Sequence, residues 1–215
     1  MATQIRRVAV LGTGVIGASW VMQFASKGLR VVCSNPAPGA YEQLKKYVNS
    51  LLERLGRHNE AEGVLERISF PSDIRSKLGE VDFVQENGPE RLDYKTLCFR
   101  LLAKATRPDT VLVSSSSGLP SSTFIHDCPR PSDVLIGHPF NPPHLIPLVE
   151  VVPHSRTSAK AVETALGFYK GVDKKPILVS QETPSFIKTV AGGAHAIVSN
   201  GIALRWAVQG PFLTQ

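Results

Sequence analysis

The sequence predicts an α/β fold with a doubly wound, mostly parallel sheet. Short apolar, β-branched runs alternate with helical patterns along most of the chain, a glycine-rich turn follows the first run, and polar clusters follow later runs. Strands that alternate with helices form βαβ units, and their connections place helices over both faces of a parallel sheet. The chain shows no internal repeat and no low-complexity segment. We therefore expect one such domain over residues 1–182.

The first half of the chain alternates strand and helix. Arg6–Leu11 is apolar and β-branched, which predicts a strand buried on both faces, and Val15–Gly28 has apolar residues at helical spacings. Leu29–Ser34 is a second strand, which ends at the turn Pro36–Gly39. Ala40–Leu55 is an amphipathic helix, because its leucines fall on one side and its lysines on the other. The rest of this half comprises a polar stretch at Gly56–Gly63, a short strand at Arg67–Phe70 and a short helix at Asp73–Leu78.

The second half continues the alternation. Helices are expected at Asp93–Ala105 and Thr157–Gly171, where apolar residues recur at helical spacings. The apolar runs between and around them predict five further strands, at Asp82–Glu86, Thr110–Ser114, Val134–Gly137, Leu145–Val152 and Pro176–Ser180.

Length and composition exclude several classes of protein. The chain has 215 residues, 42% hydrophobic and 20% charged, which suits one domain with part of a second and argues against disorder. Its net charge of +6 comes from basic residues scattered in pairs, without a basic run between aromatic residues, so nucleic-acid binding is not expected. Residues 8–24 carry no charge, but glycines and polar residues interrupt them, so they do not predict a membrane span.

The three cysteines favour a reducing compartment. Cys33, Cys98 and Cys128 are odd in number and far apart, and they form no C-x-x-C pair. This spacing supports neither a disulfide framework nor a zinc site, so we expect no bound metal. The expected location is the cytoplasm.

A glycine-rich turn follows the first strand and opens the first helix. Gly12, Gly14 and Gly17 fit G-x-G-x-x-G, which is typical of a Rossmann-type dinucleotide-binding domain in this setting. Gly12 would permit the tight turn, Gly14 would let the backbone approach a pyrophosphate, and Gly17 would let the helix pack closely on the strand. Val15 and Ile16 complete the helix N-terminus, whose N–H groups would face the phosphates.

The acidic residue that usually follows such a turn is absent. Asn35 stands at the end of the second strand, where an aspartate would bind the adenosine ribose. Asparagine can hydrogen-bond a 2′-hydroxyl but does not repel a 2′-phosphate. The sequence therefore predicts NAD as the cofactor, with NADP as the alternative.

Two later strands end in polar clusters. Ser115 and Ser117 lie in a serine run after Thr110–Ser114; by itself this run could be a solvated loop. His138 and Asn141 follow the next strand in a proline-flanked segment that fixes their directions. Glu150 lies within an apolar strand, where an ionised carboxylate needs a partner such as His138. The alternative is that Glu150 faces water on an edge strand. The remaining histidines carry no assigned chemistry: His126, His144 and His154 are expected at the surface, and His58 and His195 have no recognisable chemical partner.

These motifs together resemble the 3-hydroxyacyl-CoA dehydrogenase family, in its branch of lambda-crystallin, L-gulonate 3-dehydrogenase and carnitine dehydrogenase. The matching pieces are VAVLGTGVIGASW, SSSSG, GHPFNPP and IPLVEVVP, and near the end LRWAVQGPF. The resemblance implies that His138 is the general base, that Glu150 orients it and that Ser117 bonds the substrate oxygen. It implies that Ser115 and Asn141 lie near the nicotinamide. The reaction would be the NAD(P)-dependent interconversion of a 3-hydroxyacyl, acyl-CoA or hydroxy-acid substrate and its 3-keto form, in one setting as an accessory step of a polyketide-like pathway.

The sequence departs from the family pattern after the last strand. The family motif TPGF(I/V)xNR is here TPSFIKTV, so Thr189 replaces an asparagine of the catalytic set, Val190 an arginine and Ser185 a glycine. Residues 183–215 match only a shortened remnant of the family's α-helical domain, which a homo-oligomeric partner could complete.

Two other functions stay open at this stage. One is a catalytically weak or inactive nucleotide-binding or structural relative, as the lens role of lambda-crystallin illustrates. The other is a hydroxyacid dehydrogenase with a lysine base, which is disfavoured because Lys188 lies awkwardly for that role.

Overall fold

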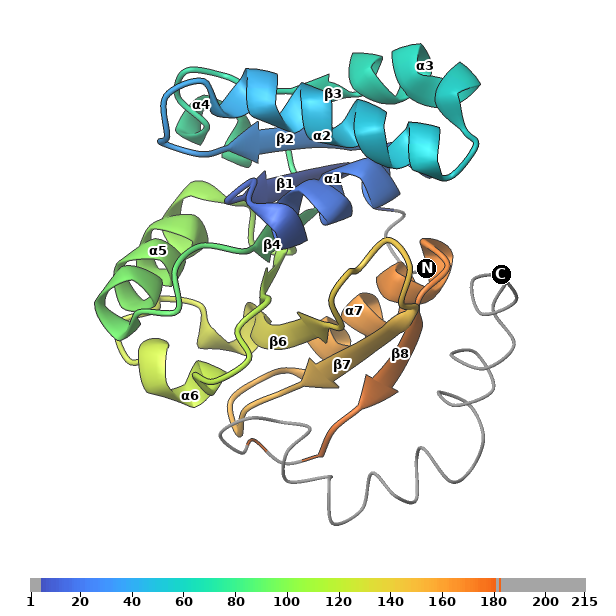
Figure 1. Cartoon of the computed structure of the whole chain (residues 1–215). Helices are drawn as coiled ribbons and strands as arrows, with labels where there is room; N and C mark the ends of the chain where they lie inside the picture. The colour runs from blue at the N-terminus through green and yellow to red at the C-terminus, as the bar shows by residue number, and fades with distance from the viewer. Residues whose placement is uncertain (1–4, 181, 183–215) are drawn as a thin grey trace.

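A single eight-stranded sheet forms the centre of the computed structural model, which describes residues 5–180 and residue 182 (Figure 1). The strand order is β3-β2-β1-β4-β5-β6-β7-β8. All neighbouring strands are parallel except β6 and β7, which pair antiparallel, so β7 and β8 run opposite to the other six. The strands are β1 (Arg7–Leu11), β2 (Arg30–Ser34), β3 (Ile68–Ser69), β4 (Phe83–Glu86), β5 (Val111–Ser114), β6 (Val134–Pro139), β7 (Leu148–Val152) and β8 (Lys175–Leu178). The predicted doubly wound α/β fold is confirmed.

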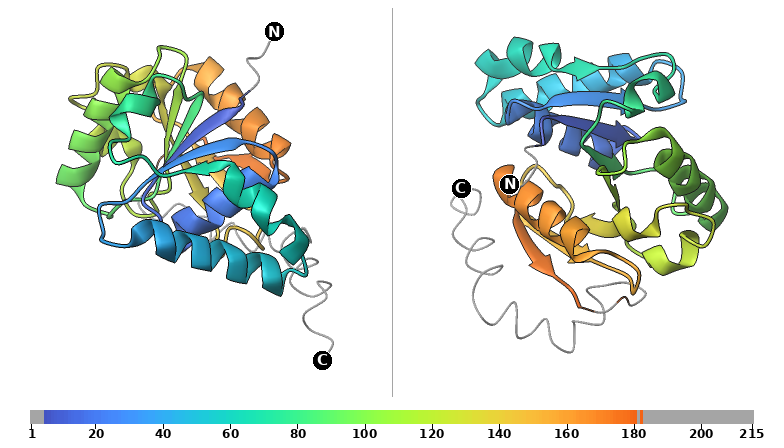
Figure 2. Two further views of the ribbon diagram at one scale, coloured as in Figure 1. Left: turned by 90° about the horizontal axis from the view of Figure 1, so that it is seen from above. Right: turned by 180° about the vertical axis from the view of Figure 1, so that it is seen from behind.

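Helices cover both faces of this sheet (Figure 2). Side chains of α1, α2, α3 and α7 form one buried apolar cluster with the sheet, and side chains of α4, α5 and α6 form a second cluster on the opposite face. Successive strand residues alternate between the two, as a sheet buried on both faces requires. The α-helices are α1 (Val15–Ser26), α2 (Ala40–Arg54), α3 (Ala61–Glu66), α4 (Arg75–Leu78), α5 (Leu92–Ala105), α6 (Ser121–Phe124) and α7 (Ala159–Gly171).

Five aromatic rings tie the first and last long helices to the middle of the sheet. Trp20 stacks on Phe24 within α1, with ring centroids 5.1 Å apart, and also lies 5.6 Å from Tyr169 of α7. Phe83 of β4 lies 4.2 Å from Phe168 of α7. Aromatic pairs at these separations stabilise beyond the area they bury, so α1 and α7 are held side by side above β4.

The structure adds short helices that the sequence pattern did not predict. The stretch expected to be only polar, Gly56–Gly63, contains the 3₁₀-helix η1 (His58–Glu60) and the start of α3. Arg57 pairs with Glu60 at 2.7 Å in this turn, and Val64 is buried against the core, which explains why the segment is ordered despite its polarity. α6 and the 3₁₀-helix η2 (Pro131–Asp133) fill the connection between β5 and β6.

Two strand boundaries also differ from the prediction. β6 continues through His138 to Pro139, so the histidine belongs to the strand itself and not to the loop after it. β7 begins at Leu148, because Leu145 and Ile146 donate their amides to the Pro142 carbonyl in a turn. Residues 183–215, with the expected helical remnant, Lys188 and Thr189, lie outside the described residues. No helix within the described part of the chain is both long and apolar enough to cross a membrane.

Candidate active site

A hollow of about 370 Å³ opens at the carboxyl ends of β4, β5 and β6, beside the start of α1. Ligands of open α/β sheets bind at this edge, where the strand order reverses. Five of the predicted site residues line it: Ile16, Ser115, Ser117, His138 and Asn141. Asn87, Gly88, Glu90, Lys95, Pro139 and Phe140 complete the lining.

His138 and Glu150 face each other as cross-strand partners on β6 and β7. The His138 Nδ1 atom lies 2.9 Å from Glu150 Oε2, and the side chains are 20% and 1% exposed. Glu150 is therefore not on a water-facing edge, because β8 covers the far side of β7. A carboxylate accepts hydrogen bonds, so Nδ1 donates to it, and in a neutral ring Nε2 is then the nitrogen that can accept a proton. This tautomer is the one that a general base requires.

Glu90 shapes the serine loop that borders the histidine. Its Oε1 atom accepts hydrogen bonds from the Ser116 hydroxyl at 2.5 Å and from the Ser117, Gly118 and Leu119 amides at 2.8–3.2 Å. Burial alone would raise the pKa of Glu90, but these hydrogen bonds and the nearby Lys95 charge outweigh it, so the pKa lies below its usual value. The fixed loop leaves Ser117 exposed at the hollow.

The glycine turn has the geometry that its sequence predicted. Gly12 has a φ of +79°, and a Cβ there would lie 2.7 Å from the Asn87 carbonyl oxygen. A Cβ on Gly17 would lie 1.8 Å from the Gly12 carbonyl oxygen, so α1 packs against the turn without room for a side chain. A Cβ on Gly14 would meet no atom within 4 Å, and no side chain caps the α1 N-terminus, which begins at Val15. The turn therefore has open space where a pyrophosphate would approach, and the residues present fit a dinucleotide.

Asn35 lies at the end of β2, beside the turn and outside the hollow. Its Nδ2 atom donates to the Thr13 hydroxyl at 3.0 Å, and its Oδ1 atom accepts from the Ala37 amide at 3.0 Å. The side chain thus braces the turn and contributes no charge near it.

Comparison with known proteins assigns this domain to a family. Residues 7–183 match the family model described as 3-hydroxyacyl-CoA dehydrogenase, NAD binding domain. The chain belongs to the 3-hydroxyacyl-CoA dehydrogenase family. It is therefore similar to NAD-dependent oxidoreductases that act on CH–OH groups, and NAD is the cofactor that its binding domain implies.

Relatives of this dehydrogenase match almost its whole length. A 3-hydroxyacyl-CoA dehydrogenase of Gibberella moniliformis is 45% identical over all of the chain and 73% of its own length. An L-carnitine dehydrogenase of Pseudomonas aeruginosa is 38% identical over 99% of the chain and 72% of its own length. Among solved structures, the 3-hydroxybutyryl-CoA dehydrogenase of Escherichia coli superposes with a TM-score of 0.77 and 29% identity, over 81% of the chain and 38% of that protein.

The dehydrogenase also contains a buried polar network that the sequence analysis missed. Tyr169 donates to Gln85 Oε1 at 2.6 Å, and Gln85 Nε2 donates to the Ser115 hydroxyl at 2.8 Å. Ser115 in turn donates to Asn87 Oδ1 at 2.7 Å. Because the tyrosine hydroxyl fixes the direction of each later bond, Ser115 and Asn87 are held with defined orientations at the hollow.

A buried ion pair lies next to this network. Lys95 Nζ is 2.8 Å from Glu86 Oε2, and the two side chains are 1% and 0% exposed. The Ser114 hydroxyl donates to the same carboxylate at 2.7 Å. The charge of Lys95 is thus matched inside the protein, while Glu90 contributes a negative charge to the lining. No local pattern reveals this pair, because its members come from a strand and a helix that meet only in the fold.

One of the other histidines is buried, and a second is partly buried. His154 is 5% exposed, because its ring nitrogens bond the Pro131 carbonyl at 3.1 Å and the Arg156 amide at 3.0 Å; the surface prediction was wrong for this residue. His144 is partly buried, with its Nδ1 atom 3.1 Å from the Ser19 hydroxyl of α1. His126 and His58 are exposed. His195 lies outside the described residues.

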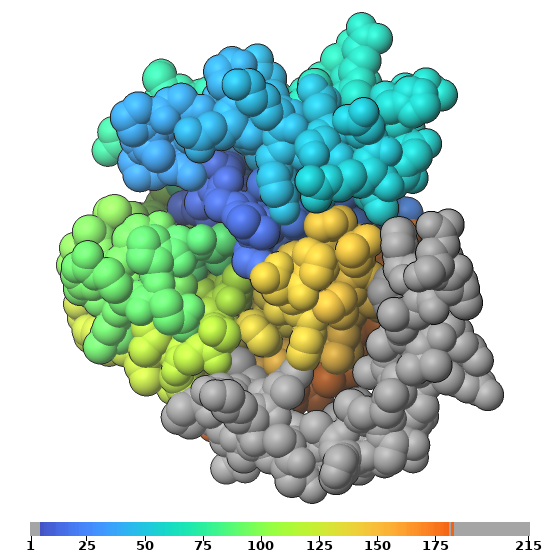
Figure 3. All heavy atoms as spheres, in the orientation of Figure 1, coloured from blue at the N-terminus to red at the C-terminus, as the bar shows by residue number. Residues whose placement is uncertain are grey.

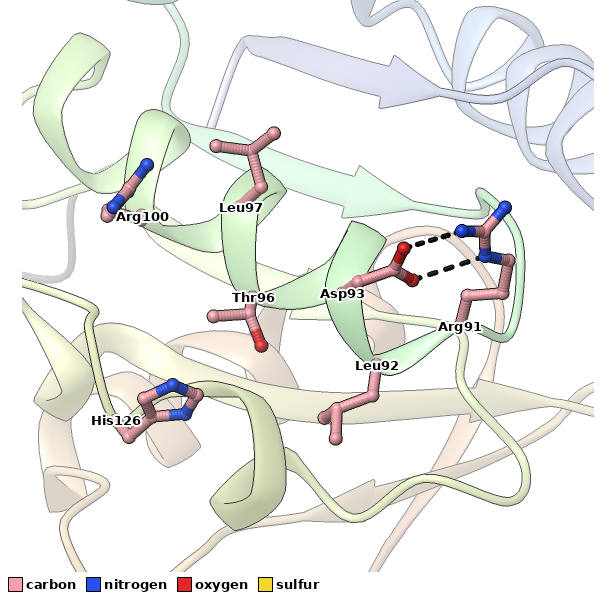
Figure 4. A pocket seen from close by; sticks show the side chains of 7 residues that line it. All are labelled: Arg91, Leu92, Asp93, Thr96, Leu97, Arg100 and His126. Atoms are coloured by element: carbon pink, nitrogen blue, oxygen red, sulfur yellow. Dashed lines mark hydrogen bonds and ion pairs between the residues drawn. The ribbon is translucent and has the colours of Figure 1, made fainter.

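A second hollow lies on α5, away from the predicted site (Figure 4). Arg91 and Asp93 pair with each other at its rim, so neither offers an unmatched charge. It contains none of the residues that the sequence assigned to chemistry, and the acid–base pair lies at the other hollow. Within residues 5–180 and 182, no group of three or more His, Cys, Asp or Glu side chains could hold a metal ion.

Proposed function

We propose that the hollow beside His138 catalyses the reversible oxidation of a secondary alcohol β to a carbonyl, which interconverts a 3-hydroxyacyl-type substrate and its 3-keto form. The observation that carries this proposal is the buried Glu150 carboxylate 2.9 Å from His138 Nδ1, with the imidazole at the wall of the hollow. NAD, when bound, would supply the hydride acceptor for this oxidation.

In this proposal, His138 and Ser117 handle the alcohol. His138 Nε2 takes the hydroxyl proton during oxidation and returns it to the oxygen during reduction. Glu150 holds the ring in the required tautomer and stabilises the imidazolium once it forms. The exposed Ser117 hydroxyl donates to the substrate oxygen as negative charge develops on it.

The glycine turn and its neighbours would hold the cofactor. The α1 N-terminus, from Gly14 and Val15 to Gly17, would bind the pyrophosphate, with Ile16 at the hollow. Asn35 would bond the adenosine ribose. Ser115 and Asn141 would lie near the nicotinamide, since both line the same hollow as His138.

The charge of the side chains that line the hollow favours some substrate classes over others. Glu90 is ionised at neutral pH, and Glu86 matches the charge of Lys95, so the wall adds no unmatched positive charge from these three groups. A small 3-hydroxy acid with a cationic group therefore suits the site at least as well as a polyanionic CoA thioester. The similarity to L-carnitine dehydrogenases and to a 3-hydroxyacyl-CoA dehydrogenase makes both worth testing.

The three cysteines support a reducing compartment, which we propose is the cytoplasm. Cys33, Cys98 and Cys128 are free thiols. Burial raises the pKa of Cys98 to about 12, so this thiol is inert to oxidation through the thiolate.

We also propose that the chain forms a homo-oligomer. The elution volume of the intact chain in size-exclusion chromatography would measure its oligomeric state.

Turnover can be measured by the absorbance of reduced nicotinamide with 3-hydroxybutyryl-CoA, L-carnitine and L-gulonate as substrates. We expect turnover with at least one of them, and His138→Ala should lower kcat by about 100-fold or more. Glu150→Gln should cause a smaller loss, because the ring keeps a partner but loses the charge. Both variants should bind NAD with unchanged affinity.

The opposite result would support a nucleotide-binding protein without catalysis. Wild-type protein that binds NAD but turns over none of the three substrates, with the same behaviour in His138→Ala, would contradict the proposed reaction.

A further inference from the structure

The segment that connects β6 to β7, residues 140–147, carries part of the active site. It starts two residues after His138, and its Asn141 and Phe140 line the hollow. In Figure 3 it is part of the gold surface directly beneath the blue and cyan atoms of the N-terminal half. Because it has no helix or strand of its own, its position depends on contacts with other elements.

One of these contacts is a buried lysine. Lys174 lies in the turn between α7 and β8 and is 6% exposed. Its ammonium donates to the Pro143 carbonyl and, at 3.4 Å, to the Ile146 carbonyl, and it lies 5.5 Å from the centroid of the Trp20 ring. Both acceptors are backbone atoms of the connecting segment, so one charge links the two halves of this segment to α1 and α7.

Two further bonds hold the same segment. His144 Nδ1 lies 3.1 Å from the hydroxyl of the buried Ser19, on the helix that opens at the glycine turn. The Lys175 amide donates to the Pro147 carbonyl at 2.8 Å. The segment is thus fixed both to the dinucleotide-binding helix and to the last strand of the sheet.

Stability does not account for the charge on Lys174. Burial disfavours the ammonium and lowers the pKa of Lys174 to about 8, although the neighbouring Asp173 acts in the opposite direction. The desolvation cost of a buried charge offsets the stability that its hydrogen bonds supply, so we expect an apolar side chain of similar volume to replace this lysine at little cost in stability. What the lysine supplies here, and an apolar side chain could not, is the pair of hydrogen bonds to the segment beside His138.

We propose that Lys174 is a positioning residue, whose ammonium holds residues 140–147 so that Asn141 and His138 keep their places at the hollow. The proposal rests on the proposed function of that hollow. It assigns Lys174 no contact with substrate or cofactor.

The full chain with Lys174→Met tests this role, and Lys175→Met is the matched control, because the Lys175 side chain is exposed and only its backbone contacts the segment. We expect Lys174→Met to lower kcat by about 10- to 100-fold, with unchanged affinity for NAD and a melting temperature no lower than that of the wild type. Amide hydrogen exchange at Leu145 and Ile146 should become at least about tenfold faster. Lys175→Met should change none of these quantities.

Unchanged exchange at Leu145 and Ile146 in Lys174→Met would overturn the proposal. A loss of rate that accompanies a general loss of protection in α1 and β1 would overturn it as well, because the lysine would then support the fold as a whole. If the wild type turns over no substrate, the proposed function fails, but the exchange measurement still decides whether Lys174 holds the segment.

Discussion

We propose that Asn35 sets the preference of the site between NAD and NADP. Its amide is uncharged and already bonds Thr13 and Ala37, so nothing at this position repels a 2′-phosphate. In Asn35→Asp, the carboxylate can keep the bond from Ala37 and accept one from the Thr13 hydroxyl. We expect NADP to bind about tenfold or more weakly in this variant, since like charges repel near a protein surface, while NAD binding changes little.

Titration of both cofactors against wild type and Asn35→Asp, followed by fluorescence, measures this preference. Equal weakening of NAD and NADP would show that the side chain only braces the turn.

Single residues in the sequence predicted which side chains meet at the hollow, but not the residues that support them. His138, Ser115, Ser117, Asn141 and Ile16 meet at one hollow, because each lies in or after the end of a strand, or opens a helix, at the same edge of the sheet. Their supporting residues give no local signal. Tyr169 and Gln85 are 84 positions apart, and their bond exists only because α7 packs on the sheet. His154 was misplaced for the same reason, since its partner Pro131 comes from a distant turn.

Substitutions of two glycines at the start of α1 should have different effects on stability and on NAD binding. A Cβ at Gly17 would overlap the Gly12 carbonyl oxygen at 1.8 Å, so Gly17→Ala must push α1 away from the turn. We expect it to lower the free energy of unfolding by about 2 kcal/mol or more and to abolish NAD binding. Urea denaturation and cofactor titration measure the two effects.

Gly14→Ala is the matched variant for this helix, because its Cβ would meet no protein atom within 4 Å. It should lower the free energy of unfolding by no more than about 1 kcal/mol, as expected for a changed N-cap, but should weaken NAD binding. NAD binding as strong as in the wild type would contradict a pyrophosphate at the Gly14 backbone.

Most elements were predictable because the hydrophobic pattern sets them directly. The predicted strand Arg6–Leu11 and the predicted helix Ala40–Leu55 differ from β1 and α2 by one residue each. The direction of β7 was not predicted, because an apolar run is the same in either direction. α3 was missed because it is short and Val64 is its only fully buried residue, while Ala61 and Leu65 pack partly buried against the core.

The pH dependence of stability is a property of the whole molecule to which Lys174 contributes. Its pKa is about 8 in the folded chain and 10.5 in the unfolded reference, so between these values the unfolded chain binds more protons. This group therefore makes the free energy of unfolding rise as the pH increases from about 8 to 10.5. Asp173, which pairs with Lys27, opposes the lowering of the pKa of Lys174. His144 beside it carries no charge in this pH range, because burial and the Lys174 and Arg54 charges lower its pKa.

Denaturation by urea at the two ends of this pH range, in wild type and Lys174→Met, isolates the effect. The wild type should gain stability relative to the variant as the pH rises, because other groups such as the buried Cys33 titrate equally in both proteins. Parallel curves would indicate that the folded lysine keeps its ordinary affinity for protons.

The antiparallel pairing of β6 and β7 places the imidazole and its carboxylate opposite each other. Since neighbouring side chains along a strand point to opposite faces, adding or deleting one residue within either strand would send the two groups to different sides of the sheet. A change of two residues would restore the common face but would separate the two groups by two positions along the strands. Insertions or deletions of an odd number of residues within β6 or β7 are therefore incompatible with this acid–base pair.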